Sequence, residues 1–149
     1  MQLTSSAFTE GATIPIKYTC KGVDFSPPLA WKNIPQGTVS FVLIMDDPDA
    51  PMGTWDHWVV YNIPSHTTDL VENASILEPA VQGMNSWGNR IYNGPCPPPG
   101  NAHRYYFALY ALDTTLSFLL KPNKVQVLHK MKDHVLDKAV LMGYFQRAA

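Results

Sequence analysis

Proline is the residue that most restricts how this chain can fold, because 13 of its 149 residues are proline. Each proline fixes its own φ and lacks a backbone N–H, so it breaks helix interiors and is kept out of central strands. This share is well above the roughly 5% of an average protein. Without a glycine period the sequence is not collagen-like, and so many prolines argue against an all-helical bundle. We therefore expect a loop-rich, mainly β fold.

Charged residues are scarce and balanced. They make up 15% of the chain, and 11 basic residues face 12 acidic ones, which gives a formal net charge of -1. With 46% hydrophobic residues, this is not the composition of a disordered chain. The near-zero net charge also lacks the basic excess expected of a protein that binds nucleic acid or an anionic membrane. The length is typical of one domain, and we assign residues 1–149 to it.

The two cysteines and the N-terminus bear on the compartment. Cys20 and Cys96 are too few for a disulfide scaffold and form no Cys-x-x-Cys pair. One disulfide stays open as an alternative, but two free thiols in a reducing compartment are the favoured interpretation. Residues 1–5 show neither the basic nor the apolar region of a signal peptide, and no apolar run is long enough to span a bilayer. The prediction is a cytoplasmic protein.

Extended segments dominate the expected secondary structure. Apolar and alternating runs predict strands over residues 13–20, 39–46, 57–63 and 103–112. Only residues 123–142 have apolar side chains at steps of three or four, which predicts a C-terminal helix capped by Gly143. The expected architecture is an antiparallel β-sandwich with a terminal helix that covers one sheet.

Polar residues gather where the predicted strands begin and end. Asp47 follows one apolar strand in a proline-rich turn, and His57 and His103 each begin another. Each residue by itself is more often structural than functional, since Asp and Pro are ordinary turn residues. Antiparallel strands can nevertheless bring these three ends to one sheet edge. A pocket with two imidazoles and rigid turns would suit a small anion.

Three motifs, in order along the chain, carry a resemblance to a known family. They are Asp47-Pro48-Asp49-Ala50-Pro51 with His57 nearby, Gly94-Pro95-Cys96-Pro97-Pro98, and His103-Arg104-Tyr105. With this spacing the chain resembles the phosphatidylethanolamine-binding protein family, from Leu3 to Phe145. The similarity is greatest to its short bacterial and archaeal branch, the Raf kinase inhibitor-like proteins.

The resemblance implies a sandwich of one larger and one smaller antiparallel sheet, with a pocket for phosphate or a phosphorylated headgroup at one end. The two histidines would donate hydrogen bonds to the anion, and Asp47 would orient a histidine or meet a ligand ammonium. Arg104 matches the motif but should point away from the pocket into a structural ion pair. The expected lining is Asp47, Pro51, His57, Gly94, Pro95, His103 and Tyr105.

A non-enzymatic binding protein without cofactor is thus the leading hypothesis, with a regulatory or inhibitory role. One alternative is a hydrolase-like enzyme that uses Cys96 as nucleophile and His103 as base. A second is a metal site of two histidines and an aspartate, for which the spacing gives only weak support. A third is inhibition of a protease or kinase through the proline-rich loop, although no kinase-regulating segment can be assigned. A homodimer also stays open.

Overall fold

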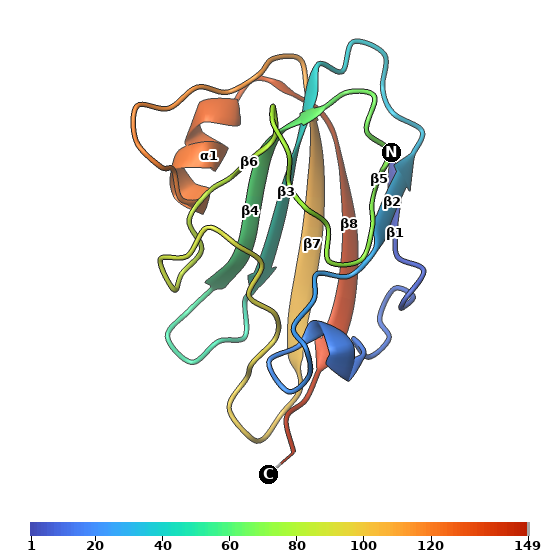
Figure 1. The fold of residues 1–149 in the computed structure, drawn as a ribbon, viewed down its shortest axis with the longest axis vertical. Helices are drawn as coiled ribbons and strands as arrows, with labels where there is room; N and C mark the ends of the chain where they lie inside the picture. Colours follow the sequence, from blue (N-terminus) through green and yellow to red (C-terminus); the bar gives the residue numbers. More distant parts are fainter. Residues whose placement is uncertain (149) are drawn as a thin grey trace.

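Two antiparallel sheets face each other in the computed structural model, which describes residues 1–148 (Figure 1). The larger sheet has the order β6-β4-β3-β7-β8, and the smaller has the order β1-β2-β5. The larger sheet consists of β3 (Ser40–Asp47), β4 (Trp55–Pro64), β6 (Val81–Gln82), β7 (His103–Leu112) and β8 (Val135–Phe145). The smaller consists of β1 (Gln2–Thr4), β2 (Leu29–Lys32) and β5 (Asp69–Leu70). The predicted sandwich of a larger and a smaller sheet is confirmed.

The central strand β3 is apolar on both faces because each face has a cover. Phe41, Leu43 and Met45 belong to the core between the two sheets. Val42 and Ile44 point the other way, into a second core that is closed by α1 (Lys124–Met131). Figure 1 shows α1 on one side of the larger sheet and β1, β2 and β5 on the other. Burial on both faces explains why the sequence of this strand is continuously apolar rather than alternating between apolar and polar residues.

The predicted helix over 123–142 is correct only in its first part. Asn123 and Gln126 form a capping box at the start of α1, and the helix ends at Met131. Asp133 then adopts a positive φ of 69°, and β8 pairs with β7 along its whole length. Buried Ala139, Leu141 and Phe145 recur at steps of two and four residues, which places them on one face of a strand. No helix within residues 1–148 is long and apolar enough to cross a membrane.

The predicted strand over 13–20 is also wrong. Thr13 forms an isolated parallel bridge with Tyr144, and the N–H of Ile14 donates to the Tyr144 carbonyl. Pro15 follows and has no N–H with which to extend this pairing. The chain turns instead into the short 3-10 helix η1 (Ile16–Tyr18). The segment therefore lies against the end of β8 and then leads to Cys20.

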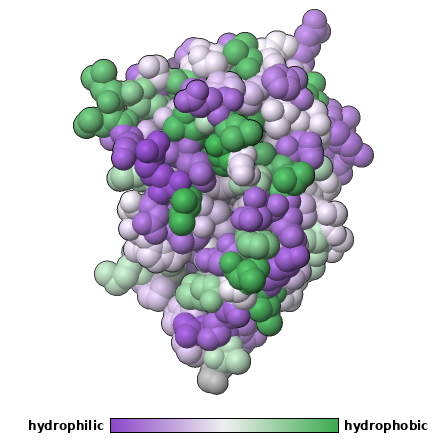
Figure 2. Space-filling model, viewed as in Figure 1, coloured by the Kyte–Doolittle hydropathy of each residue, from purple (hydrophilic) through white to green (hydrophobic). Residues whose placement is uncertain are grey.

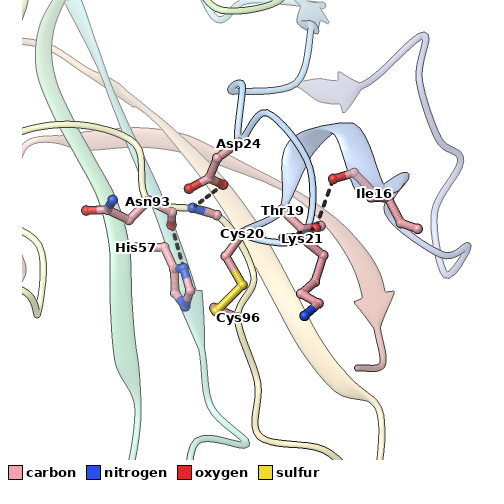
Figure 3. Close-up of a disulfide and its surroundings, with 9 residues drawn as sticks. Ile16, Thr19, Cys20, Lys21, Asp24, His57, Asn93 and Cys96 are labelled. Atoms are coloured by element: carbon pink, nitrogen blue, oxygen red, sulfur yellow. Dashed lines mark hydrogen bonds between the residues drawn. A yellow bond between two sulfur atoms is a disulfide. The ribbon is translucent and has the colours of Figure 1, made fainter. Parts of the chain in front are cut away.

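Cys20 and Cys96 form a disulfide, which corrects the favoured prediction of two free thiols (Figure 3). The two residues are 76 positions apart in the sequence. No spacing rule could pair them, because their proximity results from the packing of the η1 region against the proline-rich loop at 94–100. Residues 1–148 contain no free cysteine.

Candidate functional site

The three polar strand ends converge at one edge of the larger sheet, as the antiparallel pairing requires. Asp47 at the end of β3 pairs with Trp55 at the start of β4, and Asp46 pairs with Tyr106 near the start of β7. These ends surround a cavity of about 270 Å³. Its lining consists of Asp47, Ala50, Pro51, Met52, Trp55, His57, Trp87, Cys96, Pro97, Pro98, His103 and Tyr105. Asp47, Pro51, His57, His103 and Tyr105 are thus gathered as predicted.

Gly94 and Pro95 do not line the cavity; their backbone groups anchor the proline-rich loop that forms one of its walls. The N–H of Gly94 donates to Asp24 Oδ1 over 3.0 Å, and the Pro95 carbonyl accepts from the N–H of Cys20 over 3.1 Å. A Cβ on Gly94 would collide with the Asp24 carboxylate and the Tyr18 carbonyl. The two residues therefore position the proline-rich loop and are not among the residues that line the cavity.

His57 is fixed in one tautomer by its surroundings. Its Nδ1 lies 2.6 Å from the Asn93 carbonyl oxygen, which can only accept, so Nδ1 carries the proton. Figure 3 shows the second ring nitrogen pointing away from the Asn93 backbone. Burial lowers the pKa of His57 below its usual 6.5, against smaller opposing effects of Asn93 and Asp47. At neutral pH the ring is therefore uncharged and Nε2 is an acceptor.

His103 is oriented by Asp47. Its Nδ1 lies 2.7 Å from Asp47 Oδ2, and the other carboxylate oxygen accepts the backbone N–H of Asp49 over 2.8 Å. Asp47 is only 3% exposed, so this carboxylate has few competing partners. The pair directs His103 Nδ1 to the carboxylate and leaves Nε2 for a ligand. Asp47 thus acts as an orienting residue, one of the two roles implied for it.

Tyr105 contributes a buried hydroxyl to the cavity. The side chain is 0% exposed, and its oxygen makes no hydrogen bond of good geometry within residues 1–148, although the Asp47 carboxylate is close enough to interact with it. Its ring packs edge-on against His57 at 5.3 Å and stacks with His103 at 6.4 Å between centroids. Burial, followed by the Asp47 charge, raises the pKa of this hydroxyl above its usual value, so it keeps its proton. Such a donor calls for a ligand or water in the cavity.

Two tryptophans form a wall that sequence reasoning missed. Trp87 packs edge-on against both His57, at 4.9 Å, and Trp55, at 5.6 Å. Buried Asn85 shapes the loop that carries Trp87: its Oδ1 accepts the N–H of Trp87, and its Nδ2 donates to Asn93 Oδ1. Trp55 could have been suspected from its place two residues before His57. Nothing in the local pattern pointed to Asn85 or Trp87.

Arg104 points away from the cavity and clamps the turn after β3. Its Nε and terminal nitrogen contact the two oxygens of Asp49 at 2.9 Å and 2.7 Å, and its backbone N–H donates to the same carboxylate. Hydrogen bonds from Arg104 lower the pKa of Asp49 to about 2. The expected structural ion pair is confirmed, and it fixes the turn that carries Pro51.

The cavity lining contains no lysine or arginine. The polar groups that face the cavity are therefore the Tyr105 hydroxyl, the two imidazoles and the Asp47 carboxylate. Cys96 is in the disulfide and has no thiol, so the nucleophile proposed for the hydrolase alternative is absent. In the part of the chain described, no three His, Cys, Asp or Glu side chains are arranged to hold a metal ion.

Comparison with known proteins gives a consistent picture. A family profile for phosphatidylethanolamine-binding proteins matches residues 4–146. A UPF0098 protein of Methanothermobacter thermautotrophicus is 46% identical over 99% of both chains. A UPF0098 protein of Aquifex aeolicus is also 46% identical, over 99% of this chain and 89% of its own.

Two solved structures share the fold. A candidate phosphatidylethanolamine-binding protein homologue from Chlamydia trachomatis superposes with a TM-score of 0.92 at 46% identity, covering 98% of this chain and 97% of its own. YbcL of Escherichia coli, described as a member of the mammalian PEBP family, has a TM-score of 0.91 at 30% identity and covers 98% of both chains.

Proposed function

Because this chain belongs to the phosphatidylethanolamine-binding protein family, we propose that it binds a small anion, phosphate or a phosphorylated headgroup, and acts by binding rather than catalysis. The observation that carries the proposal is the buried Tyr105 hydroxyl that lines one cavity together with two oriented histidines. A ligand oxygen in this cavity would accept a hydrogen bond from the hydroxyl.

Different side chains of the pocket would donate different hydrogen bonds to the anion. Tyr105 supplies a hydrogen bond from its neutral hydroxyl, and Nε2 is the ring atom that each histidine has left for a ligand, because Asn93 and Asp47 engage Nδ1. His57 donates from Nε2 when its ring is protonated, and the Asn93 carbonyl then still accepts the proton on Nδ1. Trp55 and Trp87 supply an apolar wall beside these polar groups.

Binding is thereby coupled to proton uptake. His57 is neutral at pH 7 because its pKa is lowered, and a bound anion stabilises the protonated ring. Affinity should therefore rise as the pH falls from 7 toward and below 6.5. This direction follows from the histidines as long as the ligand itself keeps its charge.

Calorimetric titration tests the proposal. Inorganic phosphate and phosphoethanolamine are titrated into the wild type, His103→Ala and, as a matched control, His129→Ala on the exposed face of α1. We expect the wild type and the control to bind alike and His103→Ala to bind about tenfold more weakly or not at all, which is the loss of a charged hydrogen bond. Equal binding by all three proteins, or none by any, would contradict the proposal.

A regulatory role through a protein partner is a further proposal, supported by the exposed tip of the proline-rich loop. Pro98 and Pro99 are exposed, while Pro97 is buried against the pocket. A partner that bound this tip would contact the pocket wall directly. Protease and kinase assays with the wild type and Pro98→Ser would test it. Inhibition that is unchanged by the substitution would show that the partner binds another part of the protein.

The cytoplasmic location stays a prediction, and the disulfide supplies its test. Disulfides persist in oxidising compartments and are rare in most reducing cytosols. Rapid alkylation of thiols in intact cells, followed by mass measurement, reports the state of Cys20 and Cys96. Two alkylated thiols fit a cytoplasmic location, whereas an intact disulfide favours an oxidising compartment.

A further inference from the structure

The charge of this chain is unevenly distributed in a way that its total conceals. Residues 116–132 contain four lysines and no acidic residue, whereas the rest of the chain contains seven basic and twelve acidic residues. Lys124 is neutralised by Asp46 and Asp56, at 3.2 and 2.7 Å. Lys121, Lys130 and Lys132 remain exposed. The segment is thus a local basic region on an otherwise acidic protein.

The same segment presents two leucines directly to solvent. Leu119 is 103% exposed and Leu120 is 85% exposed, and Val125 on the first turn of α1 is 68% exposed. Figure 2 shows hydrophobic side chains that project at the upper left, beside strongly hydrophilic ones, where Figure 1 places α1 and the loop before it. Adjacent leucines exposed to this degree are costly in water and typical of an interaction site.

The exposure is imposed by anchors on both sides of the leucines. Leu116 is buried in the core under α1, and the Phe118 ring packs edge-on against Tyr61 at 5.1 Å. On the other side Pro122 is buried, and its carbonyl accepts the N–H of Met84 over 2.8 Å. The loop is therefore held with its tip outward. Lys130, which lies 5.7 Å from the Phe118 ring centroid, is kept beside this tip.

We propose that residues 118–132 form a docking surface for an anionic membrane, with Leu119 and Leu120 inserted into the interface. Exposed apolar side chains on a segment with three exposed lysines combine the two contributions that hold proteins on such a surface, apolar burial and attraction to anionic lipids. Charge complementarity favours an anionic lipid surface over a neutral one. The net charge of the whole chain hides this surface, because the basic residues of the segment are offset by acidic residues elsewhere in the chain.

The surface is separate from the pocket. In Figure 1 the β3–β4 connection and the start of β7, which form the pocket, lie toward the lower end, whereas α1 and the preceding loop lie at the upper left. None of the residues of the docking surface lines the cavity. Docking therefore does not depend on the proposed anion binding, and each can be tested while the other fails.

Vesicle sedimentation tests the docking surface. Wild-type protein is mixed with vesicles of equal parts phosphatidylcholine and phosphatidylglycerol, or of phosphatidylcholine alone. We expect binding to the anionic vesicles, at least about tenfold stronger than to the neutral ones, and loss of this difference at high salt. Leu119→Ser with Leu120→Ser should weaken binding by about a hundredfold, because two leucines no longer enter the interface. Lys121→Glu should weaken binding to anionic vesicles alone.

Matched control variants show whether vesicle binding depends on these particular leucines and lysines. Leu77→Ser removes a leucine that is 74% exposed elsewhere, and Lys32→Glu reverses an exposed charge on the smaller sheet. Both variants should bind as the wild type does, and so should His103→Ala, which tests the pocket. Equal binding to both vesicle types, or binding unaffected by the leucine substitutions, would overturn the proposal. So would a wild-type dimer that the leucine substitutions dissociate while no vesicle binding is seen.

Discussion

At the scale of single residues, the hydrogen bonds that the pocket can offer a ligand depend on which atom of each side chain has no partner within the protein. Nδ1 of His57 and Nδ1 of His103 are both engaged, by a carbonyl and by a carboxylate, so only Nε2 is left on each ring. The residue types alone would allow either nitrogen to face a ligand. The partners Asn93 and Asp47 therefore set the chemistry of the site.

Tyr105→Phe should separate stability from binding. Its hydroxyl makes no hydrogen bond of good geometry within residues 1–148, so its removal should change the free energy of unfolding by no more than about 1 kcal/mol. Phosphate affinity should fall by about five- to tenfold. Denaturant unfolding and calorimetry measure the two effects. Tyr106→Phe, on the opposite face of β7, is the control for binding, and a Tyr105→Phe variant that binds normally would argue against contact with the anion.

His57 should make the ligand-free protein less stable as the pH falls. Its pKa is lower in the folded state than the usual 6.5, so below 6.5 the unfolded state binds more protons. The stability contributed by neutral His57 is present above 6.5 and is lost as the pH falls through the folded value. His57→Asn, which can still donate to Asn93, should show a shallower decline in denaturant unfolding between pH 7 and pH 5. An equally steep decline would contradict the assignment, and exposed His66→Asn serves as the control.

At the scale of elements, β8 shows how a glycine can serve packing rather than capping. Gly143 was expected to end a helix, but it lies within β8 where the N-terminal segment crosses. A Cβ there would lie 2.6 Å from Ile14 Cγ1 and 2.9 Å from Phe8 Cε2, both in the core. The glycine allows this close approach.

Gly143→Ala should therefore destabilise the fold by about 1–3 kcal/mol, because the core has no space for the methyl group. Denaturant unfolding measures the change. Val140→Thr, a substitution of similar shape at a position that is 42% exposed on β8, should change stability by less than about 0.5 kcal/mol. Equal stabilities of the two variants would indicate that the N-terminal segment moves away easily.

The turn after β3 is held by one ion pair. Asp49→Asn should lower the free energy of unfolding at pH 7 by about 1 kcal/mol, a value kept modest because Arg104 is partly exposed. The pKa of Asp49 is lowered to about 2, so the contribution is present above the usual 3.8 and is lost as the pH falls through 2. Wild-type and variant unfolding curves should converge over that range. Asp69→Asn, at an exposed position of β5, serves as the control.

At the scale of the whole molecule, the disulfide connects the N-terminal segment to the pocket. Reduction, or Cys20→Ser with Cys96→Ser, should lower the free energy of unfolding by about 4 kcal/mol, since the bond closes a loop of 76 residues. Denaturant unfolding with and without reductant measures this. The reduced wild type should match the double variant, and the native protein should resist thiol alkylation. Identical unfolding curves with and without reductant would show that packing alone holds the loop.

Much of the architecture could be read from local pattern. The residues of β3, β4 and β7 are apolar runs bounded by turn residues, and their antiparallel pairing brings Asp47, His57 and His103 to one edge whatever the details of the fold. Motif order and spacing were enough for family membership. The sequence by itself therefore determined the sandwich and five of the twelve residues that line the pocket.

Only the tertiary structure decided the rest, because each remaining feature depends on a partner far along the chain. The segment at 135–145 has apolar positions compatible with helix or strand, and pairing with β7 selects the strand. The disulfide, the Trp87 wall and the free nitrogens of the histidines likewise require contacts across 30 or more residues. The local sequence pattern indicates which side chains prefer burial, whereas the fold determines which of them another part of the chain covers. Leu119 and Leu120 are apolar, but no part of the fold covers them.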